Sequence, residues 1–195
     1  KRLILPALWA IIFLTLAAGS VSALELDAKA AVLMDARSGQ ILFAHNSETP
    51  LPVASLTKMM TLTIVLEALD RGEIALTDVI TASEFAASKR GSRVWLEAGE
   101  QMTLEELLYA IAVGSANDAA VAVAEYIAGS EDEFVALMNQ RAQELGLSNT
   151  HYKNASGLPP ESGSEHTMTA LDVAHLARHV LSVPKMMDYV SVYEY

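Results

Sequence analysis

Residues 52–61 read Pro-Val-Ala-Ser-Leu-Thr-Lys-Met-Met-Thr, and an extended segment becomes a long apolar helix there. Ser55 begins the expected helix, at a position where a hydroxyl ordinarily caps free backbone N–H groups. A capping box would place Glu or Gln three positions later. This chain has Lys58 instead, in the first turn, where the helix dipole disfavours a positive charge. Because residues three apart share a helix face, the Lys58 amine can reach the Ser55 hydroxyl. Burial beside a positive helix end lowers a lysine pKa, so we expect this pair to act as nucleophile and base.

A second polar cluster, Ser115-Ala116-Asn117, precedes the most hydrophobic run of the chain, Asp118–Ala128. A helix that is apolar on all sides belongs in a core, so polar groups at its start are expected inside the molecule. Taken alone, these residues would be interpreted as helix caps. Taken with Ser55 and Lys58, they match two parts of the set S-x-x-K, S-D-N and K-T-G, which is typical of penicillin-binding proteins and class A β-lactamases.

On these motifs the chain resembles the serine-type D-alanyl-D-alanine carboxypeptidases, which are low-molecular-mass penicillin-binding proteins. Four segments carry the resemblance: residues 30–45, 52–61, 114–120 and 154–177. It extends over residues 24–195, essentially everything after the leader. It implies an α/β (α+β) fold like that of DD-peptidases and class A β-lactamases. In that fold an antiparallel sheet flanked by helices adjoins a helical subdomain, and the nucleophile lies at their interface.

The resemblance also implies a role for each matching residue. Ser55 corresponds to the nucleophile that attacks the penultimate D-alanine, and Lys58 corresponds to the general base. Ser115 corresponds to the hydroxyl that relays a proton to the leaving D-alanine, and the Asn117 amide corresponds to a substrate-binding group. His166 matches a histidine in a loop near the active site, which predicts a supporting role; its alternative is a surface loop residue. No cofactor and no metal are implied.

The third motif, Lys-Thr-Gly, does not occur in the 195 residues. In the family it follows the second motif by about 100 residues, which corresponds to a point past Tyr195. Lys153 and Lys185 do not replace it, because neither is followed by Thr-Gly. We therefore expect residues 24–195 to be the N-terminal part of a DD-peptidase domain without its C-terminal strands. As written, this chain is expected to be inactive.

The function implied is removal of the terminal D-alanine from peptidoglycan pentapeptide stems ending in D-Ala-D-Ala, through an acyl-enzyme on Ser55. β-Lactam antibiotics would then be covalent inhibitors. One alternative is a class A-like β-lactamase, which needs a glutamate-activated water; no E-x-x-x-N loop follows Asn117 in the right stretch. The other alternative is a non-catalytic penicillin-binding-like cell-wall scaffold, which the absent third motif favours.

Residues 1–23 have the pattern of a signal peptide. Lys1-Arg2 precedes an apolar run from Leu3 to Ala18, and small residues follow at Val21-Ser22-Ala23. The run is shorter than the roughly 20 residues that span a bilayer, which favours a signal peptide. An uncleaved membrane anchor is the alternative. The interpretation places the protein in the periplasm or on the outer face of the bacterial cytoplasmic membrane. The resemblance further implies membrane attachment through a segment after Tyr195.

Composition excludes two classes of protein. The chain has no cysteine, which rules out a lipid anchor on cysteine and any disulfide framework. Its 24 acidic residues outnumber 13 basic ones, for a net charge of −11, which argues against nucleic-acid binding.

The rest of the pattern predicts one hairpin and about five helices. The hairpin covers residues 30–45. Helices are expected from Ser55 to Arg71, after Thr103 with Glu106, over 118–128, from Ser130 to Leu145, and from Thr169 to about Ser182. Residues 77–99 are expected to be irregular, apart from one helical segment over Ser83–Ser88 and a turn at Gly91-Ser92.

Two further features leave alternatives open. His175 and His179 have the spacing of a two-histidine metal site, but no acidic residue lies between them, and an exposed helix face is the alternative. Trp95 is expected to pack in the core, with a place at the edge of the site as its alternative.

Overall fold

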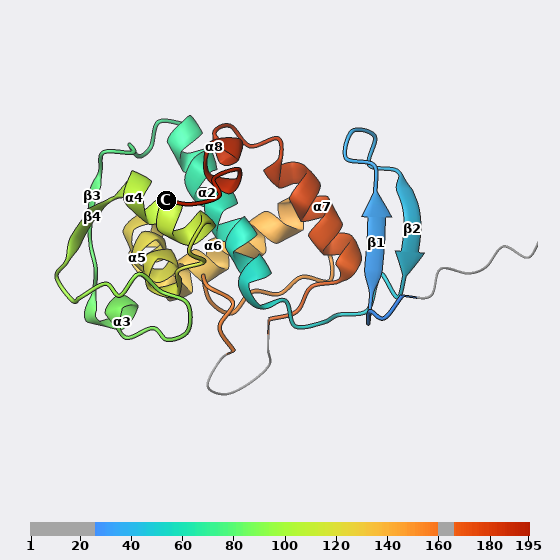
Figure 1. Ribbon diagram of the computed structural model, residues 1–195, viewed down its shortest axis with the longest axis horizontal. Helices are drawn as coiled ribbons and strands as arrows, with labels where there is room; N and C mark the ends of the chain where they lie inside the picture. The colour runs from blue at the N-terminus through green and yellow to red at the C-terminus, as the bar shows by residue number, and fades with distance from the viewer. Residues whose placement is uncertain (1–25, 160–165) are drawn as a thin grey trace, which may run out of the picture.

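The structure is a computed structural model that describes residues 26–159 and 166–195 (Figure 1). Two short two-stranded antiparallel sheets lie at opposite ends of a group of packed helices. The expected signal peptide, residues 1–23, lies outside the described residues. In chain order the elements are β1 (Ala31–Met34), β2 (Ile41–His45), the 3₁₀ helix η1 (Ala54–Thr57), α2 (Lys58–Asp70), β3 (Val79–Thr81), α3 (Glu84–Ala87), β4 (Gln101–Thr103), α4 (Leu104–Ala112), α5 (Asn117–Ala128), α6 (Glu131–Glu144), α7 (Ala170–Val180) and α8 (Met186–Val190).

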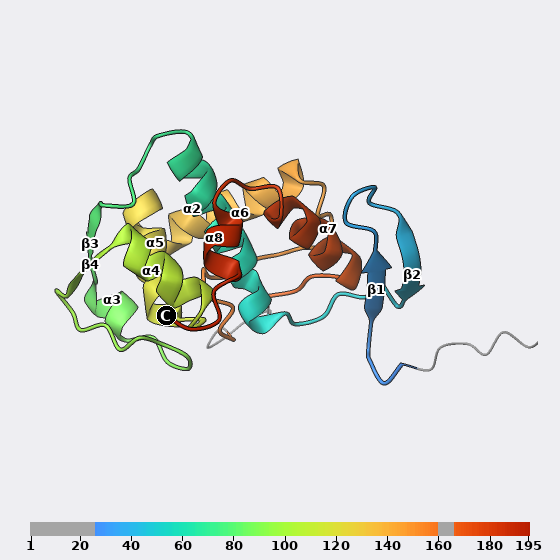
Figure 2. The same ribbon diagram turned by 45° about the horizontal axis from the view of Figure 1, so that its top comes forward.

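The predicted N-terminal hairpin is confirmed. β1 pairs with β2 from Ala31 opposite His45, and the register shifts after Leu33. Helix α7 lies beside β1 in both views (Figures 1 and 2). The Arg178 side chain of α7 donates hydrogen bonds to the carbonyl oxygens of Ala36 and Arg37, at 3.1 and 3.3 Å. The turn of the hairpin is therefore held by the helix that covers it.

Helix α5 lies inside the molecule, as its composition predicts. All residues from Asn117 to Ala124 are buried, and exposure begins only in the last turn, at Tyr126. Helices α2, α4 and α6 pack around it (Figure 2). Each fully buried large apolar side chain contributes about 1.5–3 kcal/mol to stability. The largest buried apolar side chains of these three helices are Met60, Leu66, Leu104, Leu107, Leu108, Phe134 and Met138.

Helix starts were predictable from their caps. Thr103 and Glu106 form the expected capping box at α4. The Ser130 and Thr169 hydroxyls accept from backbone N–H groups three residues later, at the starts of α6 and α7. Such a cap stabilises a helix by about 1 kcal/mol. Helix α7 ends at Val180, two residues before the predicted end.

Two local expectations are wrong, and one helix was missed. The helical segment expected over Ser83–Ser88 is present as α3, but the rest of residues 77–99 is not wholly irregular, because Val79–Thr81 pairs with Gln101–Thr103 as β3 and β4. Trp95 is 70% exposed rather than in the core, and the Arg93 guanidinium lies 3.6 Å from its ring centroid. The helix Met186–Val190 was not foreseen.

The fold class is nevertheless the predicted mixture of helices and antiparallel strands, and β1 and β2 form the sheet that α7 covers in the part described. Among residues 26–159 and 166–195, no helix is long and apolar enough to cross a membrane.

Candidate active site

Ser55 lies in a 3₁₀ turn rather than at the cap of an α-helix. Residues Ala54–Thr57 form η1, α2 begins only at Lys58, and no side chain caps either element. The residue before the serine, Ala54, has a φ of +44°, which costs a non-glycine residue about 1 kcal/mol or more. The expectation that Ser55 begins the helix as a cap is corrected, because the tighter turn leaves its side chain exposed.

The Lys58 amine meets three oxygen atoms. Its Nζ lies 3.3 Å from Ser55 Oγ, 2.7 Å from Asn117 Oδ1 and 2.8 Å from the carbonyl oxygen of Ser156. The lysine is only 4% exposed. The predicted reach from Lys58 to Ser55 is therefore present.

The partners of Lys58 determine where a neutral amine points. The carbonyl oxygens of Asn117 and Ser156 can only accept hydrogen bonds, whereas a serine hydroxyl can also donate. A neutral amine has two hydrogens and one lone pair. When the two hydrogens go to Asn117 and Ser156, the lone pair faces the Ser55 hydroxyl. Burial lowers the pKa of Lys58 to about 8, so about a tenth of the molecules hold the neutral amine at pH 7.

Asn117 is the first residue of α5 and connects two other segments. Its Oδ1 accepts from Lys58, while its Nδ2 donates to the Arg90 carbonyl at 2.6 Å. Its backbone N–H donates to the Ser92 carbonyl at 2.8 Å. The next residue, Asp118, is fully buried, and its carboxylate accepts from the backbone N–H groups of Val94 and Leu96. The segment from Arg90 to Leu96 is thus fixed around the start of α5.

Ser115 lies on the strained turn before Asn117, with a φ of +53° and a half-buried side chain. Ser92 Oγ supports this turn by donating to the Gly114 carbonyl at 2.6 Å. Within the described part of the chain, the Ser115 hydroxyl makes no hydrogen bond. Of the sequence-predicted residues, the structure therefore joins Ser55, Lys58 and Asn117 in one network and leaves the Ser115 hydroxyl outside it.

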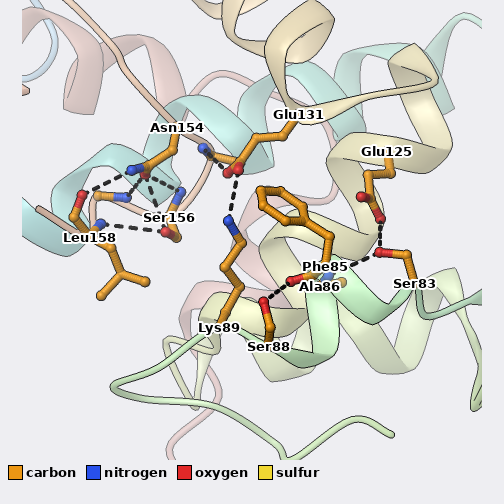
Figure 3. A network of polar contacts seen from close by, with 12 residues as sticks. Ser83, Phe85, Ala86, Ser88, Lys89, Glu125, Glu131, Asn154, Ser156 and Leu158 are labelled. Atoms are coloured by element: carbon orange, nitrogen blue, oxygen red, sulfur yellow. Dashed lines mark hydrogen bonds and ion pairs between the residues drawn. The ribbon is translucent and has the colours of Figure 1, made fainter. Parts of the chain in front are cut away.

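The loop Asn154–Leu158 supplies the third partner of Lys58, which sequence reasoning missed. Asn154 Oδ1 accepts from the backbone N–H groups of Ser156 and Gly157 and from Ser156 Oγ, and its Nδ2 donates to the Leu158 carbonyl (Figure 3). Thr61 Oγ1 of α2 donates to the Ala155 carbonyl at 2.7 Å. The loop is therefore shaped by one asparagine and attached to the helix that contains Lys58. The order Asn-x-x-Gly was the available signal, because asparagine favours such turns.

Glu131 attaches the same loop to the opposite side. Its carboxylate accepts from the Ala155 N–H at 3.0 Å and pairs with Lys89 Nζ at 3.0 Å (Figure 3). The glutamate side chain is 8% exposed and the lysine side chain 17%. Lys89 Nζ also lies 3.5 Å from the ring centroid of Phe85. This buried pair connects the segment after α3, helix α6 and the loop beside Lys58.

His166 is buried rather than exposed on a surface loop. It is 3% exposed, and its Nδ1 accepts from the Lys153 N–H at 3.2 Å. Burial lowers its pKa, and an accepting Nδ1 places the ring proton on Nε2, which has no partner in the described part of the chain. The ring borders a cavity of about 70 Å³ shared with Ala54 and Gly157. The structure therefore places His166 beside the residue that precedes Ser55.

The histidine pair on α7 does not form a metal centre in the described residues, where no cluster of three or more metal-ligating side chains is found. His175 is exposed. His179 is not on an exposed face, because its Nε2 lies 2.9 Å from Glu67 Oε1, which also accepts from Arg141 at 2.7 Å.

Comparison with known proteins identifies the family of the chain. Residues 17–195 match the peptidase S11 family, D-alanyl-D-alanine carboxypeptidase. The whole chain is 43% identical to the D-alanyl-D-alanine carboxypeptidase DacF of Bacillus subtilis and covers 51% of it. Thus the chain spans about half the length of that relative.

Solved structures agree. Penicillin binding protein 5 from Haemophilus influenzae matches with a TM-score of 0.83 and 35% identity, over 90% of this chain and 51% of that one. The D-alanyl-D-alanine carboxypeptidase DacD from Francisella tularensis matches with a TM-score of 0.81 and 40% identity, over 87% and 40%. From the match over almost its entire length, the chain belongs to the peptidase S11 family of D-alanyl-D-alanine carboxypeptidases.

Proposed function

We propose that the protein containing this chain is a serine-type D-Ala-D-Ala carboxypeptidase, which removes the terminal D-alanine from peptidoglycan stem peptides. The observation that carries the proposal is the position of Lys58 Nζ, 3.3 Å from Ser55 Oγ, with both other partners able only to accept. A buried amine with a lowered pKa can act as a base toward the exposed serine that it faces, and so activates that serine as a nucleophile.

The proposed reaction has two steps. Neutral Lys58 takes the Ser55 proton while Oγ bonds to the carbonyl carbon of the penultimate D-alanine. The peptide C–N bond then breaks, and D-alanine leaves with a proton that passes from Lys58 through the Ser115 hydroxyl. In the second step water attacks the ester carbonyl and gives one proton to Lys58, the C–Oγ bond breaks, and that proton passes to Ser55 Oγ, while the other proton of the water is released. The shortened peptide leaves as a carboxylate.

The Ser55 backbone N–H and the Asn117 side-chain amide support this chemistry. The Ser55 N–H is in the first turn of η1, where helices leave N–H groups without an internal partner. It is proposed as one oxyanion donor, a kind of group whose removal costs roughly 10² to 10³ in rate. The Asn117 amide oxygen orients Lys58. One Nδ2 hydrogen donates to the Arg90 carbonyl, and the other is proposed to donate to a substrate carbonyl.

β-Lactams are proposed as covalent inhibitors, because their strained amide presents the same carbonyl to Ser55. The match to a penicillin-binding protein supports this.

Residues 1–23 are proposed as a signal peptide, and residues 24–195 as the N-terminal part of the DD-peptidase domain. The proposed location is the cell envelope outside the cytoplasmic membrane. Membrane attachment is proposed through a segment outside these 195 residues.

The test is D-alanine release from diacetyl-L-Lys-D-Ala-D-Ala by the full-length gene product, with benzylpenicillin hydrolysis measured alongside. We expect peptide hydrolysis to dominate and to be lost in Lys58→Ala but kept in Lys153→Ala, which removes an exposed lysine of the chain. Faster penicillin turnover than peptide turnover would favour the β-lactamase alternative. The 195 residues expressed alone are expected to release no D-alanine, because they contain no Lys-Thr-Gly motif.

A further inference from the structure

A second hollow lies between the segment after α3 and the Asn154–Leu158 loop. Its volume is about 790 Å³. One wall is α3 with the residues after it, and the other is the Asn154–Leu158 loop, as Figure 3 shows for Phe85, Lys89 and Ser156. Each wall also contacts the Lys58 network through its backbone, because the Ser156 carbonyl accepts from Lys58 and the Arg90 carbonyl accepts from Asn117.

The described residues that line the hollow include two basic side chains, Lys89 and Arg90, and no acidic one. Lys89 is engaged, because it pairs with Glu131. Arg90 is exposed and has no ion pair among residues 26–159 and 166–195. An exposed guanidinium on the wall of a hollow can pair with an anion.

The size of the hollow decides which part of a substrate it suits. Cavities of roughly 300–1,000 Å³ hold drug-sized ligands, far larger than the single alanine that follows the scissile bond. The longer, acyl side of the stem peptide is the only part of the substrate with that bulk. Phe85, which is 50% exposed, and Leu158 offer apolar contact for the methylene groups of a side chain.

We propose that this hollow is a substrate subsite in which Arg90 binds a carboxylate carried by the acyl side of the stem peptide. The inference rests on the proposed carboxypeptidase function and adds a specificity-determining residue to it. A guanidinium matches a carboxylate with two parallel hydrogen bonds, which a lysine cannot supply. A peptide whose side chain ends in a carboxylate next to the D-Ala-D-Ala unit is therefore preferred over one ending only in an amine.

The test uses two peptides that differ by one carboxylate: N-acetyl-L-Lys-D-Ala-D-Ala and N-acetyl-meso-diaminopimelyl-D-Ala-D-Ala. The quantity measured is the ratio of their kcat/KM values with the full-length gene product. We expect Arg90→Gln to lower the preference for the carboxylated peptide about tenfold. Arg90→Lys should keep part of it. The matched control is Arg37→Gln, an exposed arginine in the turn of the β1–β2 hairpin, which should leave the ratio unchanged.

A second measurement needs no variant. The preference of the wild-type protein should shrink when ionic strength is raised, because salt screens an exposed ion pair. A ratio insensitive to both Arg90→Gln and salt, with both peptides hydrolysed, would overturn the subsite alone. If neither peptide is hydrolysed and no penicillin is bound, the carboxypeptidase proposal falls, and the subsite falls with it.

Discussion

Lys58 Nζ lies 2.7 Å from Asn117 Oδ1, and this contact joins the start of α2 to the start of α5 across 59 positions of sequence. Together with the Ser156 carbonyl, it leaves the lysine one direction for its lone pair, toward Ser55. The orientation of the Lys58 lone pair therefore depends on contacts among three separate segments of the chain, which contain Lys58, Asn117 and Ser156.

The pH dependence of acylation should report the lysine. The neutral amine is the active form, so the second-order rate of acylation by benzylpenicillin is expected to rise with pH. Below about pH 8 it should fall tenfold per pH unit, and above it the rate should level off. Circular dichroism across the same range checks that folding is unchanged. A rate that is flat between pH 6 and 9 would show that Lys58 is not the base.

Asn117→Asp should move that profile. The change is nearly isosteric, and it places a carboxylate where Oδ1 now accepts from Lys58 at 2.7 Å. An opposite charge this close stabilises the ammonium, which raises the pKa by about 1–3 units. The rising limb of the pH profile should shift upward by that amount. Asn139→Asp, whose amide instead joins α6 to Tyr152, is the matched control and should leave the limb in place.

Gly157→Ala should damage the site far more than Gly99→Ala. Both glycines have a positive φ, +83° and +86°, so both substitutions bear the same backbone strain of about 1–2 kcal/mol. At Gly157 an added Cβ would collide with the carbonyl oxygen of Ala54, the residue before Ser55, whereas nothing lies within 4 Å at Gly99.

We expect Gly157→Ala to cost about 3 kcal/mol or more in urea unfolding, and to lower the acylation rate of whatever protein remains folded. Gly99→Ala should lower the free energy of unfolding only by the backbone strain of about 1–2 kcal/mol. Equal losses at the two positions would contradict the assigned packing of the loop against Ala54.

Glu131→Gln should destabilise the protein through Lys89. The substitution leaves a largely buried ammonium without its carboxylate, while a glutamine oxygen can still accept from Ala155. Because Lys89 retains some solvent contact, we expect a loss of about 2 kcal/mol in the free energy of unfolding. The control is Glu133→Gln, an exposed neighbour in the same helical turn, which should change stability by less than about 0.5 kcal/mol. Identical denaturation curves for wild type and Glu131→Gln would refute the role of this pair.

Local chemistry was readable from the sequence, and distant contacts were not. The three-residue spacing of Ser55 and Lys58 predicted their contact, and Thr103 with Glu106 predicted the start of α4. The Ser156 carbonyl lies 98 positions from Lys58, and no periodicity or motif encodes that pairing.

The misses have physical reasons. Strands β3 and β4 have three residues each, too few for an alternating pattern to appear. Trp95 was expected in the core because large aromatic side chains usually pack there. Its exposure follows from Asp118, which holds the flanking N–H groups of Val94 and Leu96 and so fixes the loop with the ring outward. Glu131 was not singled out in the sequence, since its partners lie just after α3 and in a distant loop.

Covalent labelling by a penicillin tests directly whether Ser55 is the nucleophile. The full-length gene product is incubated with a fluorescent penicillin, digested, and mapped by mass spectrometry, beside Ser55→Ala and Ser115→Ala. We expect a single covalent adduct on the peptide that contains Ser55, absent in Ser55→Ala and formed more slowly in Ser115→Ala. An adduct on any other residue, or undiminished labelling of a folded Ser55→Ala protein, would contradict the assignment of Ser55 as the nucleophile.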